Sequence, residues 1–255
     1  MHDLPMTPSF RVEGRRALVT GAGRGIGLAA ATALAAAGAS VTLCARTEKE
    51  IGQGVELLSA KGYRADALCL DVTDLGAVSA AIDAAEPFDI LINNAGTNRP
   101  KPMVDVTLDD YEAVMGLNVR SAFFMVQAVA RKLIEVGRSG SIINMSSQMG
   151  HVGSARRSLY CASKWAMEGF SRACAIEFAP NGVRVNTLCP TFIETPMTKS
   201  FFENKEFKAD VLSRIKLGRL GTVEDLMGAI VFLSSDASSL MTGSSLIVDG
   251  GWTAD

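Results

Sequence analysis

Paired cysteines, long apolar runs and a large net charge are all lacking in this 255-residue chain. The five cysteines (44, 69, 161, 174 and 189) form no Cys-x-x-Cys pair and no sequence cluster with a histidine, so we expect reduced thiols and no metal site. No apolar run approaches the roughly 20 residues of a membrane span, and the N-terminus has no basic segment followed by an apolar core. A formal net charge of −2 gives no reason to expect nucleic acid or a membrane surface. We therefore expect a cytoplasmic protein with a small-molecule partner.

An acid is also missing where a dinucleotide-binding unit usually carries one. A strand-like run ends at Cys44-Ala45-Arg46, at about the distance from a glycine-rich turn where Asp or Glu would bind the ribose 2′-hydroxyl of adenosine. Here the chain has a small apolar residue and then an arginine. Either the glycine turn is not a dinucleotide site, or the site takes a different ribose.

Short apolar runs alternate with helical stretches along the chain, and no linker or internal repeat interrupts them. Such runs are typical of strands buried on both faces of a parallel sheet. We predict strands at 16–20, 40–44, 65–70, 88–92, 141–145, 183–188 and 245–248, with helices at 25–37, 47–61, 74–85, 107–136, 159–179 and 222–234. This alternation predicts an α/β fold: a doubly wound, mostly parallel seven-stranded sheet of the Rossmann type, with helices on both faces and a single domain over 1–255.

The segment 190–221 does not fit this alternation, because it is long, irregular and rich in phenylalanine. Loops of that length inside a compact domain are usually functional. We expect 190–221 to be a lid that closes over substrate and excludes water.

A run of four alternate glycines, Thr20-Gly-Ala-Gly-Arg-Gly-Ile-Gly27, lies directly between the first strand and the first helix. Glycine lets backbone N–H groups approach a pyrophosphate closely at the positive end of a helix. The alternative is a plain strand-to-helix turn, but four glycines in this setting favour the phosphate site.

Tyr160 and Lys164 are four residues apart on a predicted helix and therefore share one face. A phenol has a pKa of roughly 10, and a nearby ammonium would lower it and allow proton exchange with a carbonyl or an alcohol oxygen. Alone, the spacing is common in ordinary helices.

Together these motifs, with Asp71-Val72 after the third strand and Asn93-Asn-Ala-Gly96 after the fourth, make the chain resemble the short-chain dehydrogenase/reductase family over nearly its whole length. The resemblance implies four catalytic residues. Ser147 would bind the substrate oxygen, Tyr160 would transfer the proton beside Lys164, and the amide of Asn118 could hold a water that relays protons. It also implies a set of cofactor-binding residues: Gly21, Arg24, Gly25, Ile26, Gly27, Arg46, Asp71, Val72, Asn94, Ala95, Gly96, Tyr160, Lys164, Pro190, Ile193 and Thr195.

Within this family, the missing acid bears on the choice between NADP(H) and NAD(H). Ala45 takes the position of the acid in NAD-dependent members, and Arg46 and Arg24 can form charge-assisted hydrogen bonds to a 2′-phosphate. We therefore expect NADP(H) rather than NAD(H).

The substrate pocket is less well specified. We expect Ser147, Gln148, His151, Tyr160 and Phe192 to bind substrate, with Thr191 replacing the glycine that usually follows Pro190. Arg156 and Arg157 fit solvated surface groups better than substrate donors, while His151 fits either.

The cofactor turn and the four catalytic residues of the resemblance imply interconversion of a secondary alcohol and a ketone, and the polar loops favour a sugar, polyol or keto acid as the substrate. FIETPMT and NNAG-T-N-R are similar to 3-oxoacyl-carrier-protein reductases, but only Arg131 matches their basic docking residues and Asn181 stands where a second arginine belongs. The ending Val248-Asp-Gly-Gly-Trp252 is similar to gluconate- and polyol-type dehydrogenases. A non-catalytic dinucleotide-binding regulator is the alternative from another class.

Assembly into a homotetramer is implied by the family, through the helices predicted at 107–136 and 159–179. Their apolar residues fit either a contact with a second copy or the core of the monomer: Phe123, Phe124, Met125, Val129, Trp165, Met167 and Phe170.

Overall fold

A seven-stranded, all-parallel sheet forms the centre of the protein, which a computed structural model describes over residues 4–254. The strand order is β3-β2-β1-β4-β5-β6-β7. The strands are β1 (Arg16–Thr20), β2 (Ser40–Ala45), β3 (Ala65–Cys69), β4 (Ile90–Asn93), β5 (Gly140–Met145), β6 (Val183–Pro190) and β7 (Ser245–Val248). Every residue of β4 and β5 is buried, as expected of central strands in a parallel sheet. The predicted doubly wound fold is confirmed.

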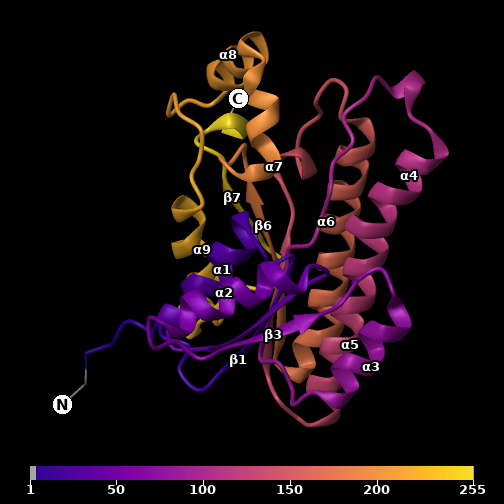
Figure 1. The fold of residues 1–255 in the computed structure, drawn as a ribbon. Coiled ribbons are helices and arrows are strands. Elements are labelled where there is room, and N and C mark those ends of the chain that lie inside the picture. Colours follow the sequence, from indigo (N-terminus) through magenta and orange to yellow (C-terminus); the bar gives the residue numbers. More distant parts are fainter. Residues whose placement is uncertain (1–3, 255) are drawn as a thin grey trace.

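Helices cover both faces of this sheet, which Figure 1 shows nearly edge-on. One face carries α1 (Gly25–Ala36), α2 (Glu48–Ser59) and α9 (Glu224–Ser234), and the other carries α3 (Leu75–Ala84), α4 (Leu108–Met115), α5 (Ser121–Glu135) and α6 (Ser158–Phe178). Neighbouring strand residues point to opposite faces. Val19, for example, packs under the first group of helices and Leu18 under the second.

The helix predicted over 107–136 divides into α4 and α5 at a π-helical turn, Gly116–Arg120. Thr107 begins α4 with a capping box to Asp110. Leu108–Glu135 is the one helical stretch among the described residues that is long and apolar enough to cross a membrane by length and composition. Its most apolar window is 56% buried within the protein, which is typical of a core helix.

The segment 190–221, predicted as irregular, contains two helices, α7 (Pro196–Lys199) and α8 (Lys205–Arg214). Asn204 caps α8 through its side chain, which accepts from the N–H of Phe207, and this cap is the local reason that a helix begins in a segment predicted to be irregular. The segment lies beyond the carboxyl ends of the strands, close to the C-terminal end of the chain (Figure 1). Its phenylalanines form an aromatic cluster with the C-terminal region: Phe192, Phe202, Phe207 and Trp252. We refer to 190–221 as the cap segment.

Candidate active site

A cavity of about 340 Å³ opens at the carboxyl ends of the parallel strands, where β1 and β4 lie next to each other and the strand order reverses. Ligands of doubly wound folds bind at this position. All sixteen residues expected to hold the cofactor line it: Gly21, Arg24, Gly25, Ile26, Gly27, Arg46, Asp71, Val72, Asn94, Ala95, Gly96, Tyr160, Lys164, Pro190, Ile193 and Thr195.

The glycine turn brings backbone close to backbone at the start of α1. Gly21 and Gly25 adopt positive φ angles of 64° and 56°, which glycine adopts readily. A Cβ at Gly27 would lie 2.2 Å from the carbonyl oxygen of Gly21. Arg24, the N-cap residue of α1, gives the helix no side-chain cap, so the first backbone N–H groups are left for a ligand. The turn therefore fits a pyrophosphate.

Asn94 fastens the end of β4 to this turn. Its side chain donates to the carbonyl oxygen of Thr20 at 2.9 Å, and the backbone N–H groups of Asn94 and Ala95 donate to the Thr20 hydroxyl at 2.9 and 3.0 Å. These bonds fix the two loops that form the floor of the cavity.

Two arginines stand at the end of the cavity where the missing acid would be. Arg46 is 74% exposed and lies 3.8 Å from Asp71, while Arg24 donates to Glu50 at 2.9 Å. Glu50 also lines the cavity, and sequence reasoning missed it because it looked like a first-turn residue of α2. The cavity thus carries two cations here, and Glu50 partly offsets their charge.

Ser147, Tyr160 and Lys164 line the same cavity. Ser147 is fixed at the end of β5: its hydroxyl accepts from the N–H of Met149 and donates to Gln148, each at 3.1 Å. The ammonium of Lys164 lies 5.5 Å from the centre of the Tyr160 ring and donates to the carbonyl oxygen of Met145 at 2.7 Å.

Burial dominates the protonation of this pair. It raises the pKa of Tyr160 to about 12, against the opposing effects of the Ser147 hydroxyl and Arg157. It lowers the pKa of Lys164 to about 8, against the opposing effects of Cys189 and Glu168. Lys164 is therefore mostly an ammonium at neutral pH, and Tyr160 is a neutral phenol able to donate a proton.

Asn118 is held by hydrogen bonds to two neighbouring segments. It is fully buried in the π-helical turn and is not among the described residues that line the cavity. Its side-chain N–H groups donate to Thr97 and Ser163 at 2.9 and 3.1 Å, and its oxygen accepts from the N–H of Thr97 at 2.8 Å. The amide therefore holds the segment after Gly96 in place, and the water relay expected through Asn118 stays a prediction.

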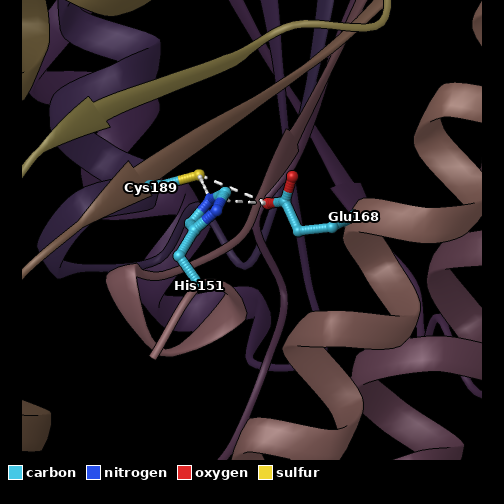
Figure 2. A group of neighbouring side chains, drawn as sticks. All are labelled: His151, Glu168 and Cys189. Carbon is cyan, nitrogen blue, oxygen red and sulfur yellow. Dashed lines mark hydrogen bonds and ion pairs between the residues drawn. The ribbon is translucent and has the colours of Figure 1, made fainter. Parts of the chain in front are cut away.

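His151 was expected in the substrate pocket, but it too is outside the described lining of the cavity. Figure 2 shows its ring directed toward Cys189 of β6 and Glu168 of α6. The ring nitrogen lies 3.4 Å from the Cys189 sulfur and 3.7 Å from a Glu168 oxygen. Its members are far apart along the chain, so no sequence pattern indicates this group.

These three side chains could hold a metal ion by proximity, since their ligand atoms lie within 4.8 Å of one another. However, the carboxylate of Glu168 already accepts hydrogen bonds from Thr187, Ser245 and Cys189 at 3.0, 2.6 and 3.3 Å. Burial also raises the pKa of the Cys189 thiol to about 12. A metal ion would have to displace these donors and ionise that thiol, so we interpret the group as a hydrogen-bond network behind Lys164.

The adjacent arginines of the 148–158 loop point in opposite directions. Arg156 is exposed, as expected. Arg157, expected at the surface, is 6% exposed and lines the cavity, together with Gln148 and Phe192. The Thr191 hydroxyl is also buried beside the cavity without a hydrogen-bond partner among the described residues.

Comparison with known proteins gives the same assignment as the motifs. The family model described as enoyl-(acyl carrier protein) reductase matches residues 21–253. Two relatives are each 40% identical: D-erythrulose reductase of Gallus gallus (97% of this chain, 99% of the relative) and gluconate 5-dehydrogenase of Gluconobacter oxydans (96% of each). A solved gluconate 5-dehydrogenase from Burkholderia cenocepacia, in complex with NADP and tartrate, is 37% identical with a TM-score of 0.93, covering 96% of this chain and 98% of that one. The chain belongs to the short-chain dehydrogenase/reductase family and is an oxidoreductase acting on CH–OH groups.

Proposed function

We propose that the protein interconverts a secondary alcohol and a ketone on a small polar substrate, a sugar, polyol or keto acid, with NADP(H) as cofactor. The observation that carries the proposal is a single cavity that joins the glycine turn to Ser147, Tyr160 and Lys164. Among the relatives are a ketose reductase and an aldonic acid dehydrogenase, which favours this substrate class over a carrier-protein thioester. Arg131, the one matching docking residue, already pairs with Asp83 at 3.0 Å.

The chemistry follows from the positions of these side chains. The nicotinamide supplies a hydride for reduction and accepts one in oxidation. Ser147, fixed through Met149 and Gln148, is suited to bind the substrate oxygen and orient it. In reduction the hydroxyl of Tyr160 donates its proton to that oxygen, and in oxidation the phenolate takes the proton back. The positive charge of Arg157 favours the phenolate, and the nearby ammonium of Lys164 acts in the same direction.

The preference for NADP(H) rests on the cation pair at the other end of the cavity. Arg46 and Arg24 offer charge-assisted hydrogen bonds to a 2′-phosphate, and β2 ends in Ala45 rather than in an acid that would repel it. The solved gluconate 5-dehydrogenase from Burkholderia cenocepacia is in complex with NADP. We propose that the remaining cofactor contacts are made by the other expected cofactor-binding residues, all of which line the cavity.

We also propose that the cap segment closes over the substrate and that the protein is a cytoplasmic homotetramer. Phe192 lines the cavity and packs on Phe202, Phe207 and Trp252, so closure would bring apolar surface over the reactive end. For assembly, some of the apolar residues of α5 and α6 are exposed: Phe123 at 43%, Phe124 at 37% and Trp165 at 54%. Met125, Val129 and Met167 are core residues instead.

The test is turnover of sugars, polyols, keto acids and 3-oxoacyl thioesters with each nicotinamide, in both directions. We expect activity with the polar substrates and NADP(H). Tyr160→Phe should leave NADPH affinity intact and lower kcat by at least about 100-fold. Equal loss of cofactor affinity and kcat would contradict the role assigned to Tyr160, and absence of turnover across the panel would refute the function.

A further inference from the structure

The reactive end of the cavity contains a second buried cation besides Lys164. Arg157 is the N-cap residue of α6 and stands three positions before Tyr160, so the two side chains lie on the same side of the helix start. Both line the cavity. The charge of Arg157 lowers the pKa of Tyr160 against the effect of burial, but this electrostatic effect leaves the hydrogen-bond donors of the guanidinium unused.

No acid compensates the charge of Arg157. Within residues 4–254 its guanidinium forms neither an ion pair nor a hydrogen bond, although the residue is only 6% exposed. Burial accordingly lowers the pKa of this arginine. A buried charge without a partner is unfavourable, and when it faces a cavity it marks a place where an anion binds.

Three phenylalanines of the cap segment hold the guanidinium in place. Its central carbon lies 4.9 Å from the ring centre of Phe201 and 5.9 Å from the ring centres of Phe192 and Phe207. The rings attract the guanidinium through its charge but offer no hydrogen-bond acceptor of the carboxylate kind. The N–H groups, which match the two oxygens of a carboxylate, therefore remain available for a ligand.

The backbone before Arg157 is strained in a way that turns this side chain inward. Arg156 has a φ of 61°, in the left-handed region that non-glycine residues adopt at a cost of about 1–2 kcal/mol. Its carbonyl oxygen accepts from the N–H of Lys101 at 3.0 Å. The consequence is that Arg156 is exposed and Arg157 buried.

We infer that Arg157 is a carboxylate-binding residue, and that the preferred substrates are hydroxy acids or keto acids of the sugar series rather than neutral ketoses or polyols. This inference rests on the proposed function and narrows its substrate class. A single planar cation suits a carboxylate better than a phosphate dianion, since Lys164, the other cation at this end, is engaged with Met145. The cofactor phosphates have their own partners at the glycine turn and at Arg24 and Arg46.

The experiment pairs aldonic acids with the alditols of the same carbon skeleton, for example D-gluconate with D-glucitol, oxidised with NADP+. The two members of a pair differ at one end of the molecule, where the acid has a carboxylate and the alditol has a neutral CH2OH group. Arg157→Met keeps a long unbranched side chain against the phenylalanines but removes the charge. It should lower the acid-over-alditol ratio of kcat/KM by about 100-fold, mainly through KM, because a buried charged pair is lost. Arg157→Lys should recover part of the ratio, since it keeps the charge without the planar fork.

Arg156→Gln is the matched control, because it removes the same charge from the neighbouring exposed position. It should leave the ratio at the wild-type value. Thermal unfolding of the NADPH complex provides a readout without turnover, since D-gluconate is already at the alcohol level. D-gluconate should raise the Tm of the wild type and of Arg156→Gln, but not that of Arg157→Met.

Failure of this inference is distinguishable from failure of the proposed function. A wild type that oxidises alditols at least as well as aldonates, or an Arg157→Met variant that keeps the ratio, overturns the inference and leaves the function standing. If neither these pairs nor any other substrate of the wider panel is turned over in either direction, the proposed function fails. The rise in Tm with D-gluconate then tests the carboxylate site without turnover. A rise that persists in Arg157→Met contradicts a carboxylate site at Arg157, and a rise that is lost in this variant supports one.

Discussion

Arg46→Asp should reverse the choice between NADP and NAD. The substitution replaces the cation after β2 with an acid, which repels a 2′-phosphate and can accept a hydrogen bond from a 2′-hydroxyl. Arg46 is 74% exposed, so the dielectric constant of water applies, and one pair of unit charges about 4 Å apart is worth roughly 1 kcal/mol. A phosphate carries about −2 charge, and the substitution changes the facing charge by two units.

The change in phosphate interaction is therefore roughly 3–4 kcal/mol without salt, and screening over a Debye length of about 8 Å reduces it to roughly 2 kcal/mol at physiological ionic strength. The ratio of kcat/KM for NADP over NAD should accordingly fall about 30-fold at that ionic strength. It should fall several hundredfold in dilute buffer, where the Debye length approaches about 30 Å.

The assay is initial-rate kinetics with both cofactors at two salt concentrations. Lys49→Asp is the matched control: it is exposed, makes the same charge change three residues later, and does not line the cavity. We expect it to change the ratio by less than about threefold at physiological salt because of screening. An unchanged ratio in Arg46→Asp, or an equal change in both variants, would refute the assignment of Arg46 to the phosphate.

Three further predictions concern the surroundings of the site. Glu50→Gln removes the acid beside the glycine turn and should raise the NADP-over-NAD ratio roughly fivefold; a lower ratio would contradict a phosphate at this end. Gly27→Ala places a Cβ 2.2 Å from the Gly21 carbonyl oxygen and should lower stability by about 1–3 kcal/mol and weaken NADPH binding, measured by denaturant unfolding and fluorescence titration. Glu168→Gln removes an anion that raises the pKa of Lys164, so the ammonium should lose its proton at lower pH. The alkaline limb of the pH profile of kcat should therefore shift to lower pH, and an unshifted limb would argue against an electrostatic coupling of Glu168 to Lys164.

The fold could be predicted from the sequence because its signals are local and repeated. Seven apolar runs separated by helical stretches leave few arrangements besides a doubly wound sheet. The π-helical turn at Gly116–Arg120 could not be predicted in this way, since the apolar pattern continues across it. In the cap segment, Thr195-Pro196 and Asn204 are the local signs of a helix start, and neither is followed by an apolar pattern of helical period.

The positions of site residues could be predicted where a motif fixes the backbone. They were harder to predict where the direction of a side chain depends on the folded surroundings. The glycine turn and the Tyr160–Lys164 pair lie together at one cavity, as their positions after strands and on a helix indicated. Arg156 and Arg157 are identical in chemistry and adjacent in sequence. What separates them is a single left-handed backbone conformation at Arg156, which no composition or periodicity reveals. His151 likewise faces residues that only the folded chain brings near it.

The cavity has a cation at each end, and their different exposure predicts different behaviour in salt. Arg46 lies at the surface, so its contribution to cofactor choice should fall steeply as ionic strength rises. Arg157 is buried against phenylalanine rings, where salt screens a charge far less. The acid-over-alditol ratio should therefore change much less than the NADP-over-NAD ratio between dilute buffer and 0.5 M KCl (about 4 Å Debye length). If both ratios declined together, the Arg157 guanidinium would have to be exposed to solvent in the working enzyme. The carboxylate of the substrate would then bind at the surface rather than inside the cavity.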